Sequence, residues 1–506
     1  MSDDNRLWRV VLAVLAVVLP ALLIWRGLYG PFMLDDTPNL QIINQLPADP
    51  NWADLWRVAN SGMAGVLGRP LSLISFLLQY RSWPDPFQFK LFNLILHLLN
   101  GILLAGVCVL LRQQTRWQLS AFSIALIVFI WLVHPIQLTA VLYVVQRMAE
   151  LAAFFTLLGI NFYLIGRRAI LRGANKLGIS LMLIGVVVCG PLAIFSKETG
   201  ALLLPFIAVL EFCLLGSAND SSVLVKSRRY MVYLLTAIGV VAFAAYLPTV
   251  MQGYSLKPFS VSERVLTQFP ILLSYLASIA LLFPDFLGLY HDDFPIVTGA
   301  LEPWYAIPAI LALISVLLLA LLKRREWPLF AFAVLWFFTG HALESTVLPL
   351  EMYFEHRNYL PLFGPVFAIV AGLQQYIQTQ VPQRQMALKS LTGLAVIWMC
   401  FITGQHSRLW GNPLAFAEAA VAAHPNSMRA QSNLVESLSR AGQFQAAFEL
   451  HLRTIDPAQD RIAPYVRWLE FRCLLPDIAL PEQALLARQA RNSGHDFGTI
   501  FQLNSL

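Results

Sequence analysis

The chain has 506 residues, of which 58% are hydrophobic and only 13% are charged. A soluble protein of this length carries about a quarter charged residues, so the composition excludes an ordinary soluble domain. The net charge is +6, but the Lys and Arg residues fall in short stretches between apolar runs. The positive-inside bias of membrane proteins produces this distribution. The positive charge therefore does not indicate a nucleic-acid-binding protein.

Eleven apolar runs are about as long as an α-helix must be to cross the roughly 30 Å of hydrocarbon in a bilayer. They lie near residues 8–25, 88–111, 118–137, 148–166, 177–195, 200–216, 231–250, 303–322, 327–347, 360–377 and 388–404. No small-residue cleavage site follows the first run, so we expect an uncleaved helix with a cytoplasmic N-terminus. The sequence predicts an all-α polytopic membrane protein whose basic loops are cytoplasmic.

The segment 265–290 is apolar but is interrupted by two prolines and an aspartate. Counting it as a full span would place the basic triplet 323–325 outside, against the positive-inside bias. A re-entrant or interfacial helix pair keeps those charges inside, and non-helical backbone is tolerated where protein covers it. We therefore predict outward-facing parts at 26–87, at 251–302 and after residue 405.

Residues 405–506 follow the predicted membrane domain, residues 1–404, and are polar and helix-favouring. Two Pro-containing segments, which begin at His424 and Asp456, recur 32 residues apart. This spacing is close to the period of about 34 residues in tetratricopeptide (TPR) helix pairs. We expect a small TPR-like helical domain, which packs on the membrane domain or binds a partner because such units need neighbours.

Two adjacent carboxylates, Asp35 and Asp36, follow the first apolar run in a turn-forming segment that also contains Asn39. Carboxylates near hydrocarbon are costly to hold, so they usually do chemistry or bind something there. At the outer face, one of them could accept the proton of an acceptor hydroxyl as a general base. The alternative is a simple turn, since Asp, Thr, Pro and Asn are turn formers.

Further charged residues lie at the predicted outer ends of other spans. Arg147 and Glu150 share a helical face and either form an ion pair that joins two helices or bind substrate. Lys197 lies in a short outer turn, where it could complement a phosphate as a point charge, with Glu198 as its local partner. The alternative for Lys197 is a lysine that snorkels to the interface.

The segment around Arg357 opens the tenth span from the outside. Its guanidinium could bind a phosphate through two parallel hydrogen bonds, while His356 could orient it or titrate. A structural pair between Arg357 and Glu355 is the alternative.

A second acidic cluster, at His291, Asp292 and Asp293, could together with Asp35 supply oxygen ligands for a divalent cation. No fixed spacing supports a metal site, and no cofactor is firmly implied. The sequence also contains no Gly-rich phosphate loop, His-Glu-x-x-His helix or Gly-x-Ser-x-Gly elbow. ATP hydrolysis, zinc proteolysis and serine-hydrolase chemistry therefore have no support.

Several motifs, in this order along the chain, make it resemble the transmembrane-and-TPR O-mannosyltransferases. They are Phe32-Met33-Leu34-Asp35-Asp36, Arg69-Pro70-Leu71-Ser72, Phe92-Asn93-Leu94-Ile95-Leu96-His97-Leu98-Leu99-Asn100, His134-Pro135, Arg147-Met148-Ala149-Glu150, Ser196-Lys197-Glu198-Thr199-Gly200 and Glu355-His356-Arg357-Asn358-Tyr359-Leu360-Pro361. Each motif is weak alone, but together they cover nearly the whole predicted membrane domain.

The resemblance implies a GT-C glycosyltransferase that uses a polyprenyl-phosphate sugar at the extracytoplasmic face and transfers the sugar to a protein hydroxyl. It implies that Asp35 is the base and Asp36 a second acceptor or orienting carboxylate, while Arg357, supported by Lys197, holds the phosphate. The predicted substrate-binding residues are Arg357, Lys197, Glu198, Arg147, Glu150, His356 and Asn39. The short loops suggest a bacterial homologue in the inner membrane, with undecaprenyl phosphate as carrier and the tail in the periplasm.

Two other classes of function stay open. The enzyme could transfer sugar to a lipid or a cell-surface glycan, as aminoarabinose transferases and O-antigen ligases do. A transporter or a membrane scaffold that recruits partners through its tail is the non-enzymatic alternative. Transporters carry ionisable residues near the bilayer midplane, whereas the charged residues here lie at the predicted outer edge. A scaffold, unlike an enzyme, would tolerate Asp35→Asn.

Overall fold

The computed structural model describes residues 3–62, 65, 67–215, 223–282, 287–299, 302–455, 462–482, 485–486 and 488–489. Helices dominate this described part, which contains no strand and a single isolated bridge between Gly299 and Glu302. The chain divides into two compact units. The bundle unit comprises residues 1–287 and 295–411, and the tail unit comprises residues 288–294 and 412–506.

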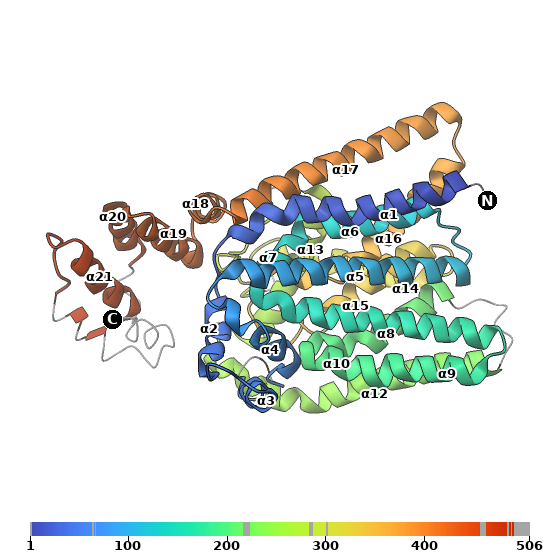
Figure 1. Ribbon diagram of the computed structural model, residues 1–506, viewed down its shortest axis with the longest axis horizontal. Helices are drawn as coiled ribbons and strands as arrows, with labels where there is room; N and C mark the ends of the chain where they lie inside the picture. The colour runs from blue at the N-terminus through green and yellow to red at the C-terminus, as the bar shows by residue number, and fades with distance from the viewer. Residues whose placement is uncertain are drawn as a thin grey trace. The chain divides into compact units, whose positions relative to one another are not determined.

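The helices of the bundle unit run side by side, and the short helices α2, α3 and α4 gather at one end of it (Figure 1). We call this the loop end. The α-helices of the unit are α1 (Asp3–Ile24), α2 (Asp36–Leu40), α3 (Trp52–Ala59), α4 (Pro70–Leu77), α5 (Pro86–Gln114), α6 (Ala121–Val133), α7 (Leu138–Leu142), α8 (Arg147–Leu171), α9 (Asn175–Leu183), α10 (Cys189–Ser196), α11 (Leu203–Leu210), α12 (Val223–Gln252), α13 (Val261–Leu281), α14 (Ala306–Leu322), α15 (Pro328–His341), α16 (Phe363–Gln378) and α17 (Pro382–Trp410).

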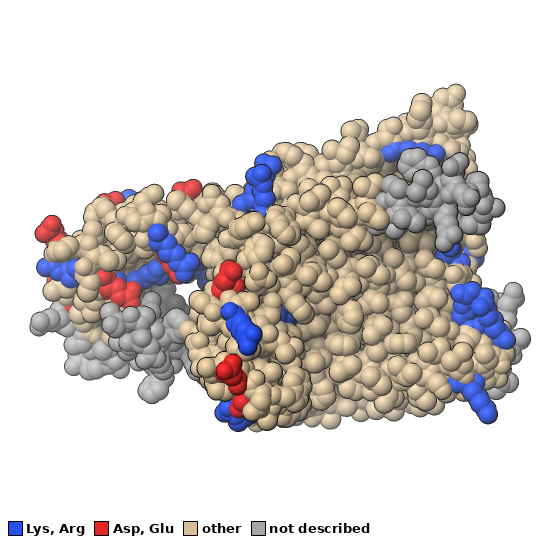
Figure 2. Space-filling view, in the orientation of Figure 1, with Lys and Arg blue, Asp and Glu red and all other residues tan. Residues whose placement is uncertain are grey.

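Seven helices of the described part are long and apolar enough to cross a membrane, and a bent pair, α6 with α7, would make eight. Each of the eleven apolar runs falls on a helix. Eleven spans are not confirmed. Helices α14, α15 and α16 have only 17, 14 and 16 residues, and the first run counts only as a shorter apolar helix within the described residues. The eight also include α13, which was not among the predicted spans. A broad band of the bundle surface carries no charged side chain (Figure 2). These features define a helical membrane protein.

Basic residues gather at the end of the bundle opposite the loop end, which we call the basic end. Arg324, which follows α14, donates to the Phe212 carbonyl at 3.4 Å and lies 3.9 Å above the Phe212 ring. Next to Phe212, the buried Glu211 carboxylate binds Arg167 at 3.3 Å and Arg228 at 3.2 Å. The basic loops at 226–229 and 323–325 therefore share one end, as the sequence predicts.

Helix α13 is long enough to span a membrane, yet both of its ends contact the loop end. Near its start, Arg264 donates to the Glu344 carbonyl at 2.7 Å, just beyond the end of α15. Near its end, the carbonyl of Ile279 lies 3.1 Å from His134 Nε2, at the end of α6. Residues 261–281 form one continuous helix through Pro270 in place of the predicted helix pair, and the interfacial position of this segment stays a prediction.

Small residues let the helices of the bundle approach closely. A Cβ atom added at Gly159 of α8 would lie 2.8 Å from the Gly185 carbonyl oxygen, and one added at Gly166 would lie 2.5 Å from the Gly178 oxygen. Close backbone contact of this kind is typical of helix pairs in membranes, where lipid gives no hydrophobic drive for association. Helix α8 therefore packs closely against α9 and against the π-helical turn Ile184–Val188 that follows it.

Within the tail unit, consecutive helices pack on one another: α18 (Pro413–Ala423), α19 (Met428–Arg440), α20 (Phe444–Thr454) and α21 (Ala463–Leu474). Gly442, between α19 and α20, has φ of +75°, a conformation that glycine adopts without strain. The predicted repeat segment that begins at Asp456 lies outside the described residues. The predicted border at 404/405 falls inside α17, because the polar residues that follow continue the helix to Trp410.

Candidate active site

The first loop presents two carboxylates in opposite environments. Leu34 has φ of +38°, a strained value for a branched residue, and Asp35 and Asp36 follow it at the start of α2. Asp36 is fully buried: its two carboxylate oxygens accept the backbone N–H of Met33 at 2.9 Å and of Val145 at 2.7 Å. Burial raises the pKa of Asp36 to about 7. Asp36 therefore joins the first loop to the start of α8 and is not accessible to an acceptor.

The Asp35 side chain is exposed, and the neighbouring Tyr143 hydroxyl can donate to its carboxylate. Its backbone holds it in place: Asp35 N–H donates to the Tyr143 hydroxyl at 3.0 Å, and Asn39 Nδ2 donates to the Asp35 carbonyl at 2.8 Å. The Tyr143 ring in turn lies 6.4 Å from the His356 ring, centroid to centroid. An exposed carboxylate is thus held beside Tyr143, a residue of a distant segment.

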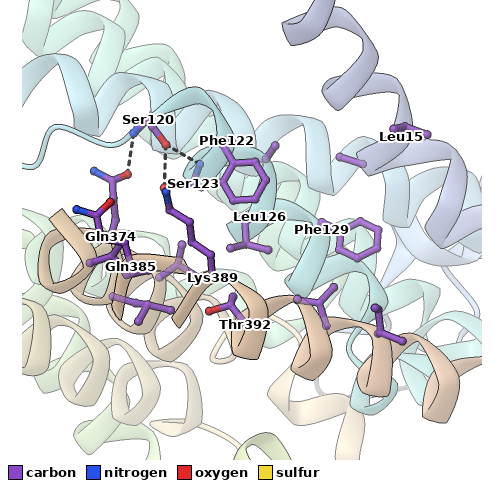
Figure 3. Close-up of a pocket in the computed structure, with 18 of the residues that line it drawn as sticks. Leu15, Ser120, Phe122, Ser123, Leu126, Phe129, Gln374, Gln385, Lys389 and Thr392 are labelled. Atoms are coloured by element: carbon purple, nitrogen blue, oxygen red, sulfur yellow. Dashed lines mark hydrogen bonds between the residues drawn. The ribbon is translucent and has the colours of Figure 1, made fainter. Parts of the chain in front are cut away.

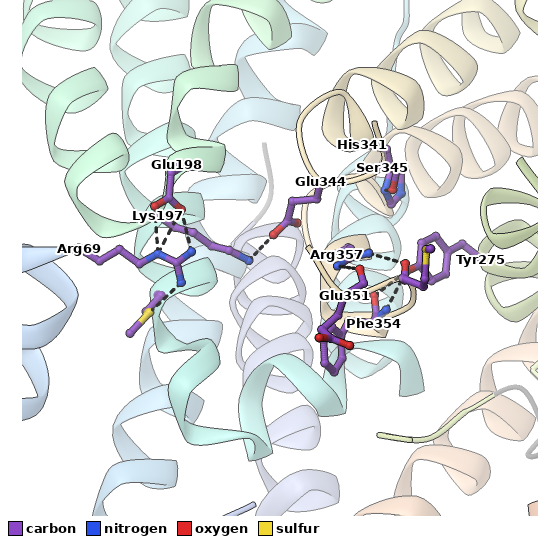
Figure 4. Close-up of polar contacts among 12 residues, drawn as sticks. Arg69, Lys197, Glu198, Tyr275, His341, Glu344, Ser345, Glu351, Phe354 and Arg357 are labelled. Carbon is purple, nitrogen blue, oxygen red and sulfur yellow. Dashed lines mark hydrogen bonds and ion pairs between the residues drawn. The ribbon is translucent and has the colours of Figure 1, made fainter. Parts of the chain in front are cut away.

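Four buried or half-buried cations, Arg69, Lys197, Arg264 and Arg357, form what we call the basic cluster. Figure 4 shows three of them, Arg69, Lys197 and Arg357. The Lys197 ammonium lies 2.7 Å from Glu344 Oε1. Arg69, at the start of α4, lies 2.8 Å from Glu198 Oε2. Nearby, Ser72 Oγ donates to the Ser196 carbonyl at 2.8 Å. These contacts join the first loop to the turn between α10 and α11.

The predicted local pair of Lys197 with Glu198 is wrong. The backbone at Lys197 is extended, with φ of −160° and ψ of 148°. In an extended chain, successive side chains point to opposite sides. Lys197 therefore reaches Glu344 beyond α15, and Glu198 reaches Arg69.

Two cations of the basic cluster have no carboxylate partner among the described residues. Arg357 donates to the carbonyls of Met352 at 2.7 Å and Glu351 at 2.5 Å, not to Glu355 as the structural alternative required. The Arg264 guanidinium donates to carbonyls and to the sulfur of Met352. With Lys197 and Arg69 neutralised by their partners, this end of the bundle keeps an excess of buried positive charge.

A small cavity adjoins the basic cluster and is lined by Lys197, Glu344, His356, Arg357 and Thr156, among others. Its volume of about 30 Å³ is enough for water but not for a sugar. Polar atoms of three lining residues, Thr156 Oγ1, His356 Nδ1 and Arg357 Nε, have no hydrogen-bond partner within the described part of the chain. Unpaired buried polar atoms are costly, so this lining is suited to water or a polar ligand.

Burial and neighbouring charges shift the pKa values of the residues around this cavity. Burial by itself raises the pKa of Glu344, but the positive charges of Lys197 and Arg357 outweigh it and hold the pKa well below its usual range. Burial, reinforced by the charge of Lys197, holds the pKa of His356 well below its usual value. His356 is therefore uncharged at neutral pH and has one ring nitrogen available to a ligand.

Arg147 and Glu150 lie in the interior of the bundle. Arg147 donates to Asn93 Oδ1 at 2.8 Å and to the carbonyls of Ser75 and Phe89, and its guanidinium also lies over aromatic rings. Both oxygens of the fully buried Glu150 carboxylate lack a hydrogen-bond partner among the residues that the structure describes. These two described residues form no ion pair, and the donors of Arg147 are engaged with protein. Their predicted role in substrate binding stays a prediction.

Glu344, Arg264 and Tyr143 belong to the site but were not predicted. Glu344 could have been found, because a single carboxylate at the end of an apolar run is a candidate functional residue by default. Tyr143 and Arg264 gave no such signal, since each is one of several similar residues and only the tertiary contacts distinguish them.

The second acidic cluster belongs to the tail unit. Asp292 accepts hydrogen bonds from Ser427 Oγ and from the Arg429 N–H, and Asp293 lies 3.0 Å from His424 Nδ1. Within the described residues, no three His, Cys, Asp or Glu side chains are arranged to hold a metal ion.

Comparison of the chain with protein-family models, with curated proteins and with solved structures gives no match. The geometry of the site and the sequence motifs are therefore the grounds for a functional proposal.

Proposed function

We propose that the protein is a membrane glycosyltransferase that transfers a sugar from a polyprenyl-phosphate donor to a hydroxyl group of a protein acceptor. One observation carries the proposal: at one end of a membrane-helix bundle, an exposed carboxylate is held by Tyr143, whose ring lies 6.4 Å from that of His356, in a region that also holds buried cations. The carboxylate is Asp35, and the unneutralised cations are Arg357 and Arg264. A lipid-linked phosphate reaches such a site from the bilayer without a nucleotide-binding motif.

The chemistry divides between these two features. Asp35 accepts the proton of the acceptor hydroxyl, whose oxygen attacks the anomeric carbon of the donor sugar. The bond between that carbon and the phosphate oxygen breaks, and the lipid phosphate leaves with the electron pair. Arg357, with Lys197 behind it, stabilises the negative charge of the leaving phosphate. A single displacement of this kind inverts the anomeric centre.

Donor binding requires movement at the basic cluster. The cavity beside Arg357 has a volume of only about 30 Å³, and two guanidinium nitrogens of this residue are bound to carbonyls of residues 351 and 352. A phosphate, which accepts charge-assisted hydrogen bonds from arginine, can replace those carbonyls if the segment 344–354 shifts. The closed cavity then corresponds to the donor-free enzyme.

The tail unit supports a protein acceptor. Its packed helices α18 to α21 and the glycine turn between α19 and α20 resemble short TPR arrays, which present concave surfaces to peptides. Under this proposal the protein lies in a bacterial inner membrane with its N-terminus in the cytoplasm and its tail unit outside.

The test compares intact envelope proteins by mass spectrometry from cells with the wild type, Asp35→Asn, Asp49→Asn or no gene. Asp49 is a matched control, because it is an aspartate of the same loop whose side chain is 95% exposed. We expect a sugar-sized mass to disappear in the Asp35→Asn and deletion strains and to persist with Asp49→Asn.

The other outcomes contradict separate parts of the proposal. If no protein mass changes on deletion, the acceptor is not a protein, and labelled lipid and glycan fractions decide between a glycan transferase and a scaffold. If Asp35→Asn behaves as the wild type while the deletion does not, Asp35 is not the base.

A further inference from the structure

A large groove lies between α1, α6, α16 and α17, away from the candidate active site (Figure 3). Its volume is about 820 Å³, within the range of about 300–1,000 Å³ typical of sites for small molecules. Most of the lining is apolar and includes Leu15, Phe122, Leu126, Phe129 and Ile397. An apolar groove on the flank of a membrane-helix bundle faces hydrocarbon, so its natural occupant is a lipid chain.

The polar residues of the groove gather at one end of it. Ser120 immediately precedes α6, Gln374 lies near the end of α16, and Gln385 and Lys389 lie near the start of α17. The start of α6 and the end of α16 are joined there, because Ser120 N–H donates to Gln374 Oε1 at 2.8 Å and Gln374 Nε2 donates to the Gln118 carbonyl at 2.8 Å. Gln385 of α17 donates to the Gln380 carbonyl, in the connection from α16, at 2.9 Å. The apolar lining continues along the helices toward the middle of the bundle.

This polar end is the one remote from Asp35. Helix α6 begins at the polar end of the groove and finishes beside His134, which contacts α13 at the loop end. The groove and the basic cluster therefore open at opposite ends of the bundle unit. Whatever binds in the groove is separate from the donor site of the proposed function.

The charge at the polar end is positive. Lys389 is exposed and forms no ion pair with any described residue, and no acidic residue lines the groove. The starts of α6 and α17 add the partial positive charge of two helix N-termini. A ligand that matches both parts of the groove has an anionic head and a long apolar chain.

We propose that this groove binds one anionic diacyl phospholipid. An acyl chain occupies the space between α6 and α17, and the phosphate lies beside Lys389. The polar head of such a lipid matches the polar end of the groove, and its apolar chain matches the apolar part. No protein partner is needed to cover the groove. The proposal is independent of the proposed glycosyl transfer, because it concerns a different end of the bundle and is tested by lipid binding alone.

Two glycine substitutions give a matched test of the chain-binding part. Gly393 lines the groove, Gly239 lies in α12 outside it, and a Cβ atom added at either position meets nothing within 4 Å. The full chain is purified in detergent, and bound phospholipid is counted by native mass spectrometry. We expect about one phospholipid on the wild type and on Gly239→Leu, and a several-fold lower occupancy on Gly393→Leu at unchanged melting temperature.

Lys389→Gln tests the head-group part, with the exposed Lys176→Gln as its control. A delipidated sample is offered equal amounts of phosphatidylglycerol and phosphatidylcholine. We expect the wild type and Lys176→Gln to favour phosphatidylglycerol, and Lys389→Gln to lose about fivefold of that preference, the contribution expected from one lysine near a phosphate.

Three results would overturn the proposal. One is equal lipid occupancy in Gly393→Leu and Gly239→Leu. Another is an unchanged preference for phosphatidylglycerol in Lys389→Gln. The third is a lipid-free dimer of the wild type that Gly393→Leu dissociates, which would assign the groove to a second copy of the chain.

Discussion

Lys197 and Glu344 face each other across the site, although they are far apart in the sequence. Their contact of 2.7 Å is buried, and its contribution to stability depends on both partners being present. Removing one charge leaves the other unpaired in a region of low dielectric constant, which is more costly than removing both. The same contact can hold the fold together and supply the cation that the proposed reaction needs, and substitutions can separate the two roles.

We expect Lys197→Met and Glu344→Met each to lower the free energy of unfolding by about 3–5 kcal/mol, and the double variant to recover most of that loss. Thermal unfolding of the purified chain measures this. Sugar transfer should be lost in all three variants. An active double variant would show that Lys197 has only a structural role.

The buried Asp36 makes the free energy of unfolding depend on pH, and its pKa gives the direction of this dependence. Its pKa is about 7 in the folded chain, whereas the ordinary value for an aspartate is 3.8, so between these values the folded chain binds more protons than the unfolded chain. The free energy of unfolding therefore falls as pH rises from about 4 to about 7. Melting temperatures across this range should show a smaller fall for Asp36→Asn than for the wild type. Asp49→Asn is expected to keep the wild-type slope, and identical slopes for all three would refute the assignment.

At the scale of elements, the turn between α10 and α11 carries two of the site residues in a very short connection. The backbone is extended at Lys197 and then forms a 3-10 turn from Glu198 to Leu202. Gly200 makes the turn compact: a Cβ atom added there would lie 2.2 Å from the carbonyl carbon of Ala193. The position of Lys197 therefore depends on a residue that has no functional group.

Gly200→Ala should displace this turn, lower the melting temperature and reduce sugar transfer. Gly190→Ala on α10 is the matched control, because its added Cβ would meet only Leu203 at 3.8 Å, an ordinary contact. We expect Gly190→Ala to be close to neutral or slightly stabilising, since alanine favours a helix. Equal effects of the two substitutions would show that close packing at Gly200 does not hold the turn.

At the scale of the whole molecule, a short segment between α13 and α14 joins the tail unit. Residues 288–294 belong to that unit although they are distant from it in sequence. Asp292 binds the first turn of α19, where Ser427 also caps the helix through the Ala430 N–H at 3.0 Å. The tail unit thus includes a segment whose neighbours in sequence, up to residue 287 and from residue 295, belong to the bundle unit.

Asp292→Ala should free the first turn of α19 and destabilise the tail unit by about 1–2 kcal/mol, the usual loss for a helix-end acceptor. Hydrogen exchange at residues 428–431 measures the effect, with the exposed Asp477→Ala as the control. Unchanged exchange in Asp292→Ala would mean that this contact adds nothing to the tail unit.

The sequence alone determined the class of fold. Apolar runs of membrane length can only be helices in a bilayer, because every backbone polar group there must be satisfied within the chain. The distribution of basic residues predicted which loops share an end, and the contacts of Arg324 and Arg228 agree. Local signals of this kind are readable because they depend on neighbours a few residues apart.

Only the tertiary structure decided how the candidate site is assembled. Asp35 and Asp36 are adjacent and chemically identical, yet one is exposed and the other is fully buried and bound by two N–H groups. Lys197 and Glu198 were expected to pair, and the extended backbone sends them to Glu344 and Arg69 instead. The burial and the charge partner of each residue depend on which helices pack together in the folded protein. The spacing of residues along the chain does not determine these long-range contacts.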